Sequence, residues 1–147
     1  MGVRTLDHVG VVVDDLEAAV AFFADLGLER GGTGSVEGEW VDRVVGLDGV
    51  RAELAFVQTP DGSSSLELVQ FHSPSDDDAV PAEPANRLGI RHLALAVDDL
   101  DAALASVRRS GYDTVGEVQD YKDIFRLCYV RGPAGIIVEL AQRLTPA

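Results

Sequence analysis

Apolar residues follow a strand-like and then a helix-like pattern near the start of the chain, and the same succession occurs again later. Residues 6–13 form an apolar run rich in valine, which predicts a strand with both faces covered. Residues 14–27 then carry apolar side chains at helical spacing and end at a glycine, which predicts a helix. With an offset of 84 residues, segment 6–29 is identical to segment 90–113 at 9 of 24 positions. The chain therefore contains an internal repeat.

Each predicted helix begins close to a pair of aspartates. Asp14 with Glu17, and Asp98 with Asp101, have the spacing of a capping box, in which side chains satisfy the free N–H groups of the first turn. We therefore expect these aspartates to start helices rather than to take part in catalysis.

Strand-like patterns follow each helix, and the first half adds one short helical turn. The first half predicts a short strand at residues 28–32, then a glycine-rich loop and a helical turn at 42–45. Two strands at 50–59 and 64–71 follow, joined by a tight turn. The second half predicts strands at residues 112–118, 125–131 and 136–141. Both halves are βαβββ, which predicts an α+β fold.

The repeat also indicates how the domain is organised. We expect a first module at residues 1–72 and a second at 89–147, combined in one compact two-module domain. The segment 73–88 carries an acidic run and three prolines, including Pro81, which is typical of a linker.

Two histidines hold matching positions in the first strand of each module. Because side chains alternate between the faces of a strand, His8 shares its face with Gly10, and His92 shares its face with Ala94. Each histidine therefore lies next to a residue that is too small to fill the space beside it, while the helix should cover the other face.

One glutamate stands among apolar residues in the last strand of each module. Burial of an unpaired carboxylate is costly, so Glu67 and Glu139 should become neutral, pair with another group or bind a cation. Two glutamates and two histidines suit zinc, nickel, cobalt, manganese or iron(II). A single strand histidine or glutamate is more often a satisfied or exposed residue, but the repetition favours metal binding. His72 should face away from Glu67 and should not bind metal.

Composition restricts the possible partners. The 147 residues include 25 acidic and 12 basic side chains, and the formal net charge is -13. This charge repels nucleic acids and anionic membranes, so we expect neither as a partner. Cys128 is the only cysteine, and neither a membrane-spanning apolar run nor a signal peptide is present, which favours the cytoplasm. The acidic balance fits adaptation to high salt or a host's compositional bias.

The two strand–helix openings and the closing segments 60–68 and 132–140 resemble the vicinal oxygen chelate superfamily. This superfamily includes glyoxalase I, methylmalonyl-CoA epimerase, extradiol dioxygenases, fosfomycin-resistance enzymes and bleomycin-binding proteins. The resemblance covers nearly the whole chain. It implies paired βαβββ modules that form a curved, cup-like mixed sheet with the helices outside, and it implies a homodimer.

The resemblance also implies one divalent metal ion held by His8, Glu67, His92 and Glu139. Four such ligands leave two adjacent positions on a six-coordinate ion for neighbouring oxygens of a small-molecule substrate. The implied function is a metal-dependent lyase or isomerase of glyoxalase or epimerase type, which promotes proton transfer next to a chelated carbonyl. Glu139 is the first candidate for the base and Glu67 is the second.

Two other functions of the superfamily are alternatives. An iron(II) extradiol-type dioxygenase uses two histidines and one glutamate, so the additional Glu67 argues against it. A non-catalytic protein that binds a bleomycin-like antibiotic is disfavoured by the complete ligand set. The chain lacks a basic cluster for the phosphates of coenzyme A, which argues against a coenzyme A thioester. The candidates for holding an acidic substrate, each more commonly a surface or packing residue, are Trp40, Arg43, Tyr121, Lys122 and Arg126.

Overall fold

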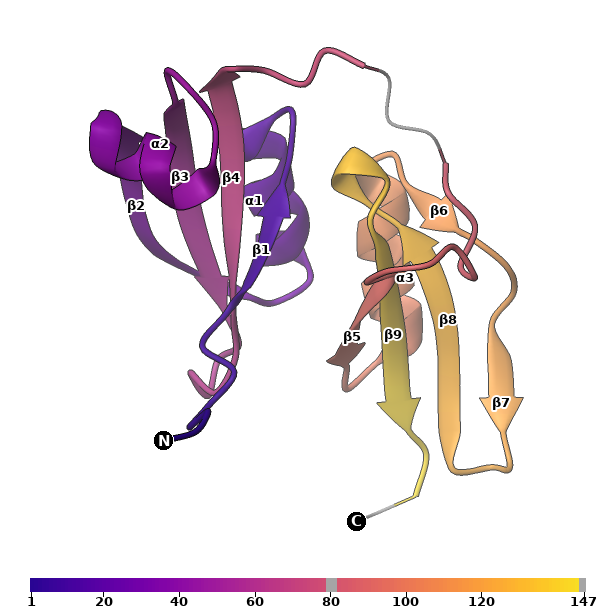
Figure 1. Cartoon of the computed structure of the whole chain (residues 1–147). Helices are drawn as coiled ribbons and strands as arrows, with labels where there is room; N and C mark the ends of the chain where they lie inside the picture. Colours follow the sequence, from indigo (N-terminus) through magenta and orange to yellow (C-terminus); the bar gives the residue numbers. More distant parts are fainter. Residues whose placement is uncertain (79–81, 146–147) are drawn as a thin grey trace. The chain divides into compact units, whose positions relative to one another are not determined.

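Two mixed β-sheets, one in each half of the chain, carry the helices of the computed structural model (Figure 1). The structure describes residues 1–78 and 82–145 and divides the chain into two units, Met1–Ala79 and Val80–Ala147. Pro81 of the predicted linker lies outside the described residues. The predicted α+β fold class is confirmed.

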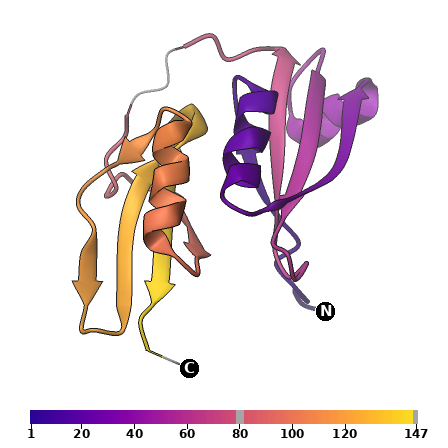
Figure 2. The same cartoon turned by 180° about the vertical axis from the view of Figure 1, so that it is seen from behind.

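The first unit contains a four-stranded sheet and two helices. In chain order the elements are β1 (Val9–Val12), α1 (Leu16–Asp25), β2 (Glu29–Glu37), α2 (Glu39–Val45), β3 (Arg51–Gln58) and β4 (Ser65–Ser73). The strand order is β1-β4-β3-β2, in which β1 runs parallel to β4 and the other pairs are antiparallel. Helices α1 and α2 cover opposite faces of this sheet, as Figures 1 and 2 show.

The described part of the second unit contains a five-stranded sheet and one α-helix. Its elements are β5 (His92–Ala96), α3 (Leu100–Arg109), β6 (Asp113–Thr114), β7 (Gln119–Tyr121), β8 (Phe125–Arg131), a 3₁₀ turn (Pro133–Gly135) and β9 (Ile137–Arg143). The strand order is β5-β9-β8-β6, with β7 also paired to β8, and β5 runs parallel to β9. The two units therefore share the central βαβββ topology. Among the described residues no helix is long and apolar enough to span a membrane.

Two predicted strands have the wrong extent. The strand expected at 28–32 continues through the expected glycine-rich loop to Glu37, because β2 pairs with β3 along most of its length. The strand expected at 112–118 is divided into β6 and β7. Thr114 pairs with Val130 while Gln119 pairs with Leu127, so β8 has too few residues to pair with every residue between these positions.

The helix N-caps lie one residue later than the capping-box spacing predicted. Asp15 accepts a hydrogen bond from the backbone N–H of Ala18 at 3.0 Å, and Asp99 accepts one from Ala102 at 3.0 Å. The second aspartate of each pair is therefore the cap, and the prediction that the aspartates serve the helix starts is otherwise confirmed.

A glutamine in the last strand of each unit holds the start of the helix. The backbone N–H of Leu16 donates to Gln70 Oε1 at 3.0 Å, and that of Leu100 donates to Gln142 Oε1 at 2.8 Å. The first N–H groups of a helix have no acceptor within the helix, so a strand side chain satisfies one of them here. The apolar side chains between helix and sheet, such as Leu68 and Leu140, are fully buried.

This arrangement predicts the effect of removing one glutamine. Gln70→Leu should lower the free energy of unfolding by roughly 1–3 kcal/mol, because the Leu16 N–H loses its acceptor while partly buried. Urea unfolding followed by the fluorescence of Trp40, the single tryptophan, measures the change. Gln58→Leu, at an exposed position, is the matched control, and equal effects of the two changes would contradict this role of Gln70.

The turn between β3 and β4 predicts a pH dependence. Asp61 accepts hydrogen bonds from the Thr59 hydroxyl at 2.7 Å and from the N–H and hydroxyl of Ser63 at 3.0 and 2.8 Å. These bonds, that from Thr59 first, lower the pKa of Asp61 from 3.8 to about 2. Because the folded-state pKa is depressed, the stabilisation is complete above the unfolded value and is lost as the pH falls through about 2.

Titration of the Asp61 side-chain carbon by NMR should give this low pKa. The Thr59→Val variant should raise it toward the ordinary value, because the largest contribution is removed. An unchanged titration in Thr59→Val would contradict the assignment.

Candidate functional site

The parallel pairing of first and last strands places one histidine and one glutamate on the same face of each sheet. Gly10 pairs with Glu67 in the first unit, and Ala94 pairs with Glu139 in the second. His8 and His92 each lie two residues before the small partner, so alternation returns them to that face. We call the face that carries Glu67 or Glu139 the glutamate face of its sheet.

His8 and Glu67 make the tighter of the two pairs. His8 Nδ1 lies 2.7 Å from Asp7 Oδ2, and since an ionised carboxylate only accepts, the imidazole donates through Nδ1. In the neutral imidazole the Nε2 lone pair is then free, 3.6 Å from Glu67 Oε2. This separation is too long for a hydrogen bond. It is close to the roughly 3 Å between two neighbouring donors on one ion with bond lengths near 2.1 Å.

The space predicted beside the first histidine is present. A Cβ atom added to Gly10 would have no neighbouring atom within 4 Å. Glu67 is only partly buried, with 25% of its side chain exposed, rather than enclosed as its apolar neighbours in the sequence suggested. The pair can therefore be reached by a ligand from the glutamate face.

His92 and Glu139 are accompanied by an aromatic residue that sequence reasoning missed. Tyr129 is the cross-strand partner of Glu139, and its hydroxyl lies 3.5 Å from His92 Nδ1. The two ring centroids are 5.0 Å apart. In the first unit, Phe56 is the cross-strand partner of Glu67 and packs edge-on against His8 at 5.6 Å. Only the register of the paired strands reveals these two aromatic positions.

The histidine and glutamate side chains are suitable ligands for a divalent cation, and each unit supplies one of each. Each unit supplies one imidazole and one carboxylate on one sheet face, and both types are ligands of the metals predicted above. Within the described part of each unit, no group of three or more histidine, cysteine, aspartate or glutamate side chains gathers to hold a metal. One unit alone therefore provides half of the predicted ligand set.

The predicted substrate contacts are scattered. Trp40 and Arg43 lie on α2 rather than in a loop, and Arg43 forms a salt bridge with Glu39. The Lys122 ammonium lies over the Tyr121 ring at 5.3 Å, at the turn between β7 and β8. Among the described residues, none of these four side chains forms a hydrogen bond, an ion pair or a ring contact with the histidine–glutamate pairs.

Arg126 lies on the sheet face that α3 covers, and His72 lies on the face that α1 covers. The Arg126 guanidinium donates to Asp101 of α3 at 3.0 Å, and this bond raises the pKa of Arg126. The ion pair argues against a substrate role for Arg126 beside Glu139. His72 Nε2 lies 2.6 Å from Glu53 Oε2, on the face opposite Glu67 as predicted.

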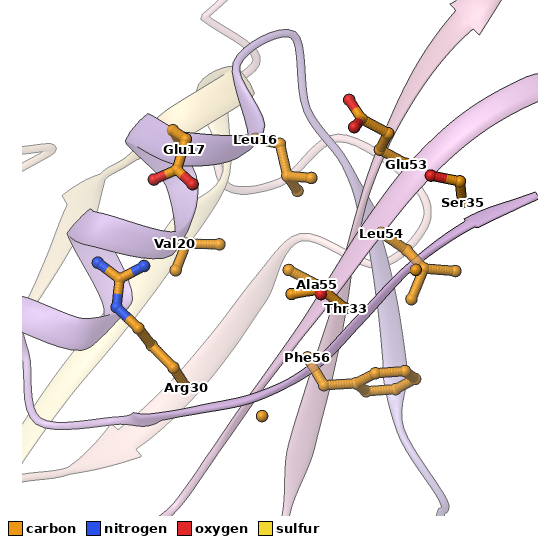
Figure 3. A pocket seen from close by; sticks show the side chains of 12 residues that line it. Leu16, Glu17, Val20, Arg30, Thr33, Ser35, Glu53, Leu54, Ala55 and Phe56 are labelled. Atoms are coloured by element: carbon orange, nitrogen blue, oxygen red, sulfur yellow. The ribbon is translucent and has the colours of Figure 1, made fainter.

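A groove of about 310 Å³ lies between α1 and strands β2 and β3 (Figure 3). Its lining includes Glu17, Arg30 and Glu53. Neither His8 nor Glu67 lines this groove, so it is separate from the histidine–glutamate pair.

Known proteins share both the sequence pattern and the fold. A glyoxalase family protein from Bacillus cereus is 38% identical, with a TM-score of 0.93 over 99% of this chain and 97% of that one. The 2-epi-5-epi-valiolone epimerase of Actinomyces sp is 28% identical over 95% of this chain and 79% of its own length. The fosfomycin resistance protein FosX from Listeria monocytogenes, a variant of which is known in complex with Mn(II) and 1S,2S-dihydroxypropylphosphonic acid, shares the fold at 13% identity. It has a TM-score of 0.62 over 95% of this chain and 90% of that one.

The family model supports the same assignment over most of the chain. The model of the Glyoxalase/Bleomycin resistance protein/Dioxygenase superfamily matches residues 7–129. This range contains both strand–helix repeats, both histidines and Glu67. The chain therefore belongs to the glyoxalase/bleomycin resistance protein/dioxygenase superfamily and has the vicinal oxygen chelate fold that its repeats predict.

Proposed function

We propose that this protein is a divalent-metal-dependent lyase or isomerase that moves a proton next to a carbonyl of a small molecule. The observation that carries the proposal is the duplicated histidine–glutamate pair on the glutamate faces of the two sheets. Within this class we favour an epimerase, because a relative that spans 95% of this chain is named as an epimerase.

His8, Glu67, His92 and Glu139 would together hold one zinc, nickel, cobalt, manganese or iron(II) ion. The Mn(II) complex of FosX shows that this fold can accommodate such an ion in another protein. When bound, a divalent ion supplies Lewis-acid polarisation of the substrate carbonyl, which makes the adjacent C–H more acidic. We expect a substrate with two adjacent oxygens and a homodimeric protein.

Glu139 is the favoured base because its carboxylate has fewer charged neighbours than that of Glu67. Glu67 Oε2 lies 3.6 Å from His8 Nε2, whereas among the described residues Glu139 forms no ion pair. Ala94 beside Glu139 has a small side chain, so the carboxylate is accessible from its glutamate face. Glu139 can take the proton from the substrate carbon and return it.

The presence of a second carboxylate suits epimerisation in particular. Inversion at a carbon requires that the proton leave on one side and return on the other. Glu67, contributed by the first module, is the second group able to carry a proton. The low number of basic side chains, 12 in the whole chain, favours a small uncharged or weakly acidic substrate over a phosphate-rich one.

Metal binding is the first testable step. Protein purified without chelators and supplied with each candidate metal should bind about one metal ion per chain, measured by plasma mass spectrometry. His8→Ala should weaken binding at least about 10–100-fold, since even loss of a group that only orients a ligand has that effect. His72→Ala is the matched control and should bind as the native protein does. Failure of the native protein to bind any of the five metals would overturn the proposal.

Proton transfer is the second step. Incubation with small hydroxy-ketones in deuterium oxide should introduce deuterium next to the carbonyl, and Glu139→Gln should slow this about 10²–10⁴-fold. Glu53→Gln is the control, because Glu53 lies on the opposite face and pairs with His72. Exchange at the native rate in Glu139→Gln would exclude this residue as the base. Tight binding of the compounds without exchange would indicate a sequestering protein instead.

A further inference from the structure

We propose that Tyr129 positions His92 by accepting a hydrogen bond from Nδ1–H, and that its own hydroxyl proton is donated to an oxygen of the bound small molecule. The part that concerns the small molecule rests on the function proposed above. The part that concerns His92 does not depend on any ligand.

The first support is the location of the tyrosine. Tyr129 pairs across the strands with Glu139, so both side chains stand on the glutamate face. Its hydroxyl is 3.5 Å from His92 Nδ1, and the two rings lie 5.0 Å apart with an angle of 34° between their planes. At 3.5 Å the contact is at the long end of the hydrogen-bond range, and a small rotation of the His92 ring is enough to shorten it to a normal hydrogen bond.

The second support is a difference between the modules in the residue that precedes the histidine. In the first module Asp7 precedes His8 and accepts from its Nδ1 at 2.7 Å. The matching residue before His92 is Arg91, which has no acceptor and donates instead to the carbonyl of Ile90. The second module therefore lacks the carboxylate that sets the histidine tautomer.

The aromatic residue beside each histidine differs in a way that compensates for the missing carboxylate. Phe56 of the first module packs against His8 but has no polar atom to offer. Tyr129 stands in the matching position and adds the one hydroxyl that can replace the missing carboxylate. Aspartate with phenylalanine in one module thus corresponds to arginine with tyrosine in the other.

The hydroxyl provides more than the carboxylate it replaces. A phenol can accept one hydrogen bond and still donate its own proton, whereas an ionised carboxylate only accepts. With His92 Nδ1–H as the donor, the Tyr129 proton remains available beside Glu139. A neutral donor at this point can hold a substrate hydroxyl or stabilise negative charge that develops on a carbonyl oxygen. Among the described residues, the first module has Phe56 at the matching position and so offers no such donor there. The Tyr129 hydroxyl can therefore distinguish the two adjacent oxygens of the bound small molecule.

The decisive measurement is the tautomer of the two histidines in the metal-free protein. Long-range ¹H–¹⁵N NMR spectra should show His8 and His92 both protonated on Nδ1. Tyr129→Phe should move His92 toward the Nε2–H form and leave His8 unchanged, so His8 is an internal control. Tyr121→Phe, which removes an exposed hydroxyl elsewhere, should leave both spectra unchanged. The phenyl ring keeps the packing, and thermal unfolding verifies that the variant folds.

A second variant tests directly whether an aspartate before His92 can replace the Tyr129 hydroxyl as the acceptor for Nδ1–H. Arg91→Asp in the Tyr129→Phe background should restore the Nδ1–H form of His92, because it recreates the arrangement of Asp7 and His8. A His92 spectrum that is the same in the native protein and in Tyr129→Phe would overturn the proposal, as would failure of Arg91→Asp to change it.

Ligand experiments test the remaining part separately. Tyr129→Phe should weaken metal binding about 10-fold. At saturating metal it should slow deuterium exchange on the order of 100-fold, the usual effect of losing one donor to a developing charge. Exchange at the native rate would overturn the substrate contact. If the native protein binds no divalent metal, the proposed function fails, while the NMR spectra still decide whether Tyr129 controls His92.

Discussion

Parallel pairing between the first and last strands of each module is the constraint on which the rest of the structure depends. It brings together residues that are more than 40 positions apart, and its register sets Gly10 opposite Glu67 and Ala94 opposite Glu139. A shift of one residue would turn Glu67 toward α1 or Glu139 toward α3, and into the apolar layer around Leu68 or Leu140. The register is therefore held by the core on one face and creates the polar pair on the other.

The last strand of each module also holds the start of the helix. Glu67 and Gln70, like Glu139 and Gln142, are three residues apart, so they project from opposite faces of the last strand. The glutamine binds the first turn of the helix, while the glutamate stands beside the histidine. One short segment thus connects the packing of the module to its candidate chemistry.

The modules share this scaffold but differ around it. His8 has a carboxylate neighbour and a phenyl ring, whereas His92 has a guanidinium neighbour and a phenol. The module containing Glu67 also has α2, which packs through Val41 against the glutamate face of its sheet near Val69 and Phe71. The second module has no matching helix among its described residues. Two equivalent frameworks can therefore contribute unequal functional groups, as a substrate with two distinct ends requires.

The sequence by itself determined the repeat, the α+β class, most strands and the faces of the histidines, because alternation and helical periodicity are local properties. The superfamily came from the resemblance of the two strand–helix openings and the closing segments to known proteins, which the family model supports. The sequence pattern placed the N-caps one residue early, since adjacent aspartates such as Asp14 and Asp15 satisfy the same pattern. Only the tertiary structure decided which strands pair and in what register. That is why Tyr129 and Phe56 were missed, and why Arg126 was expected near a substrate although it binds Asp101 on the helix side. Cross-strand neighbours are set by the packing of distant segments, and no local period in the chain records them.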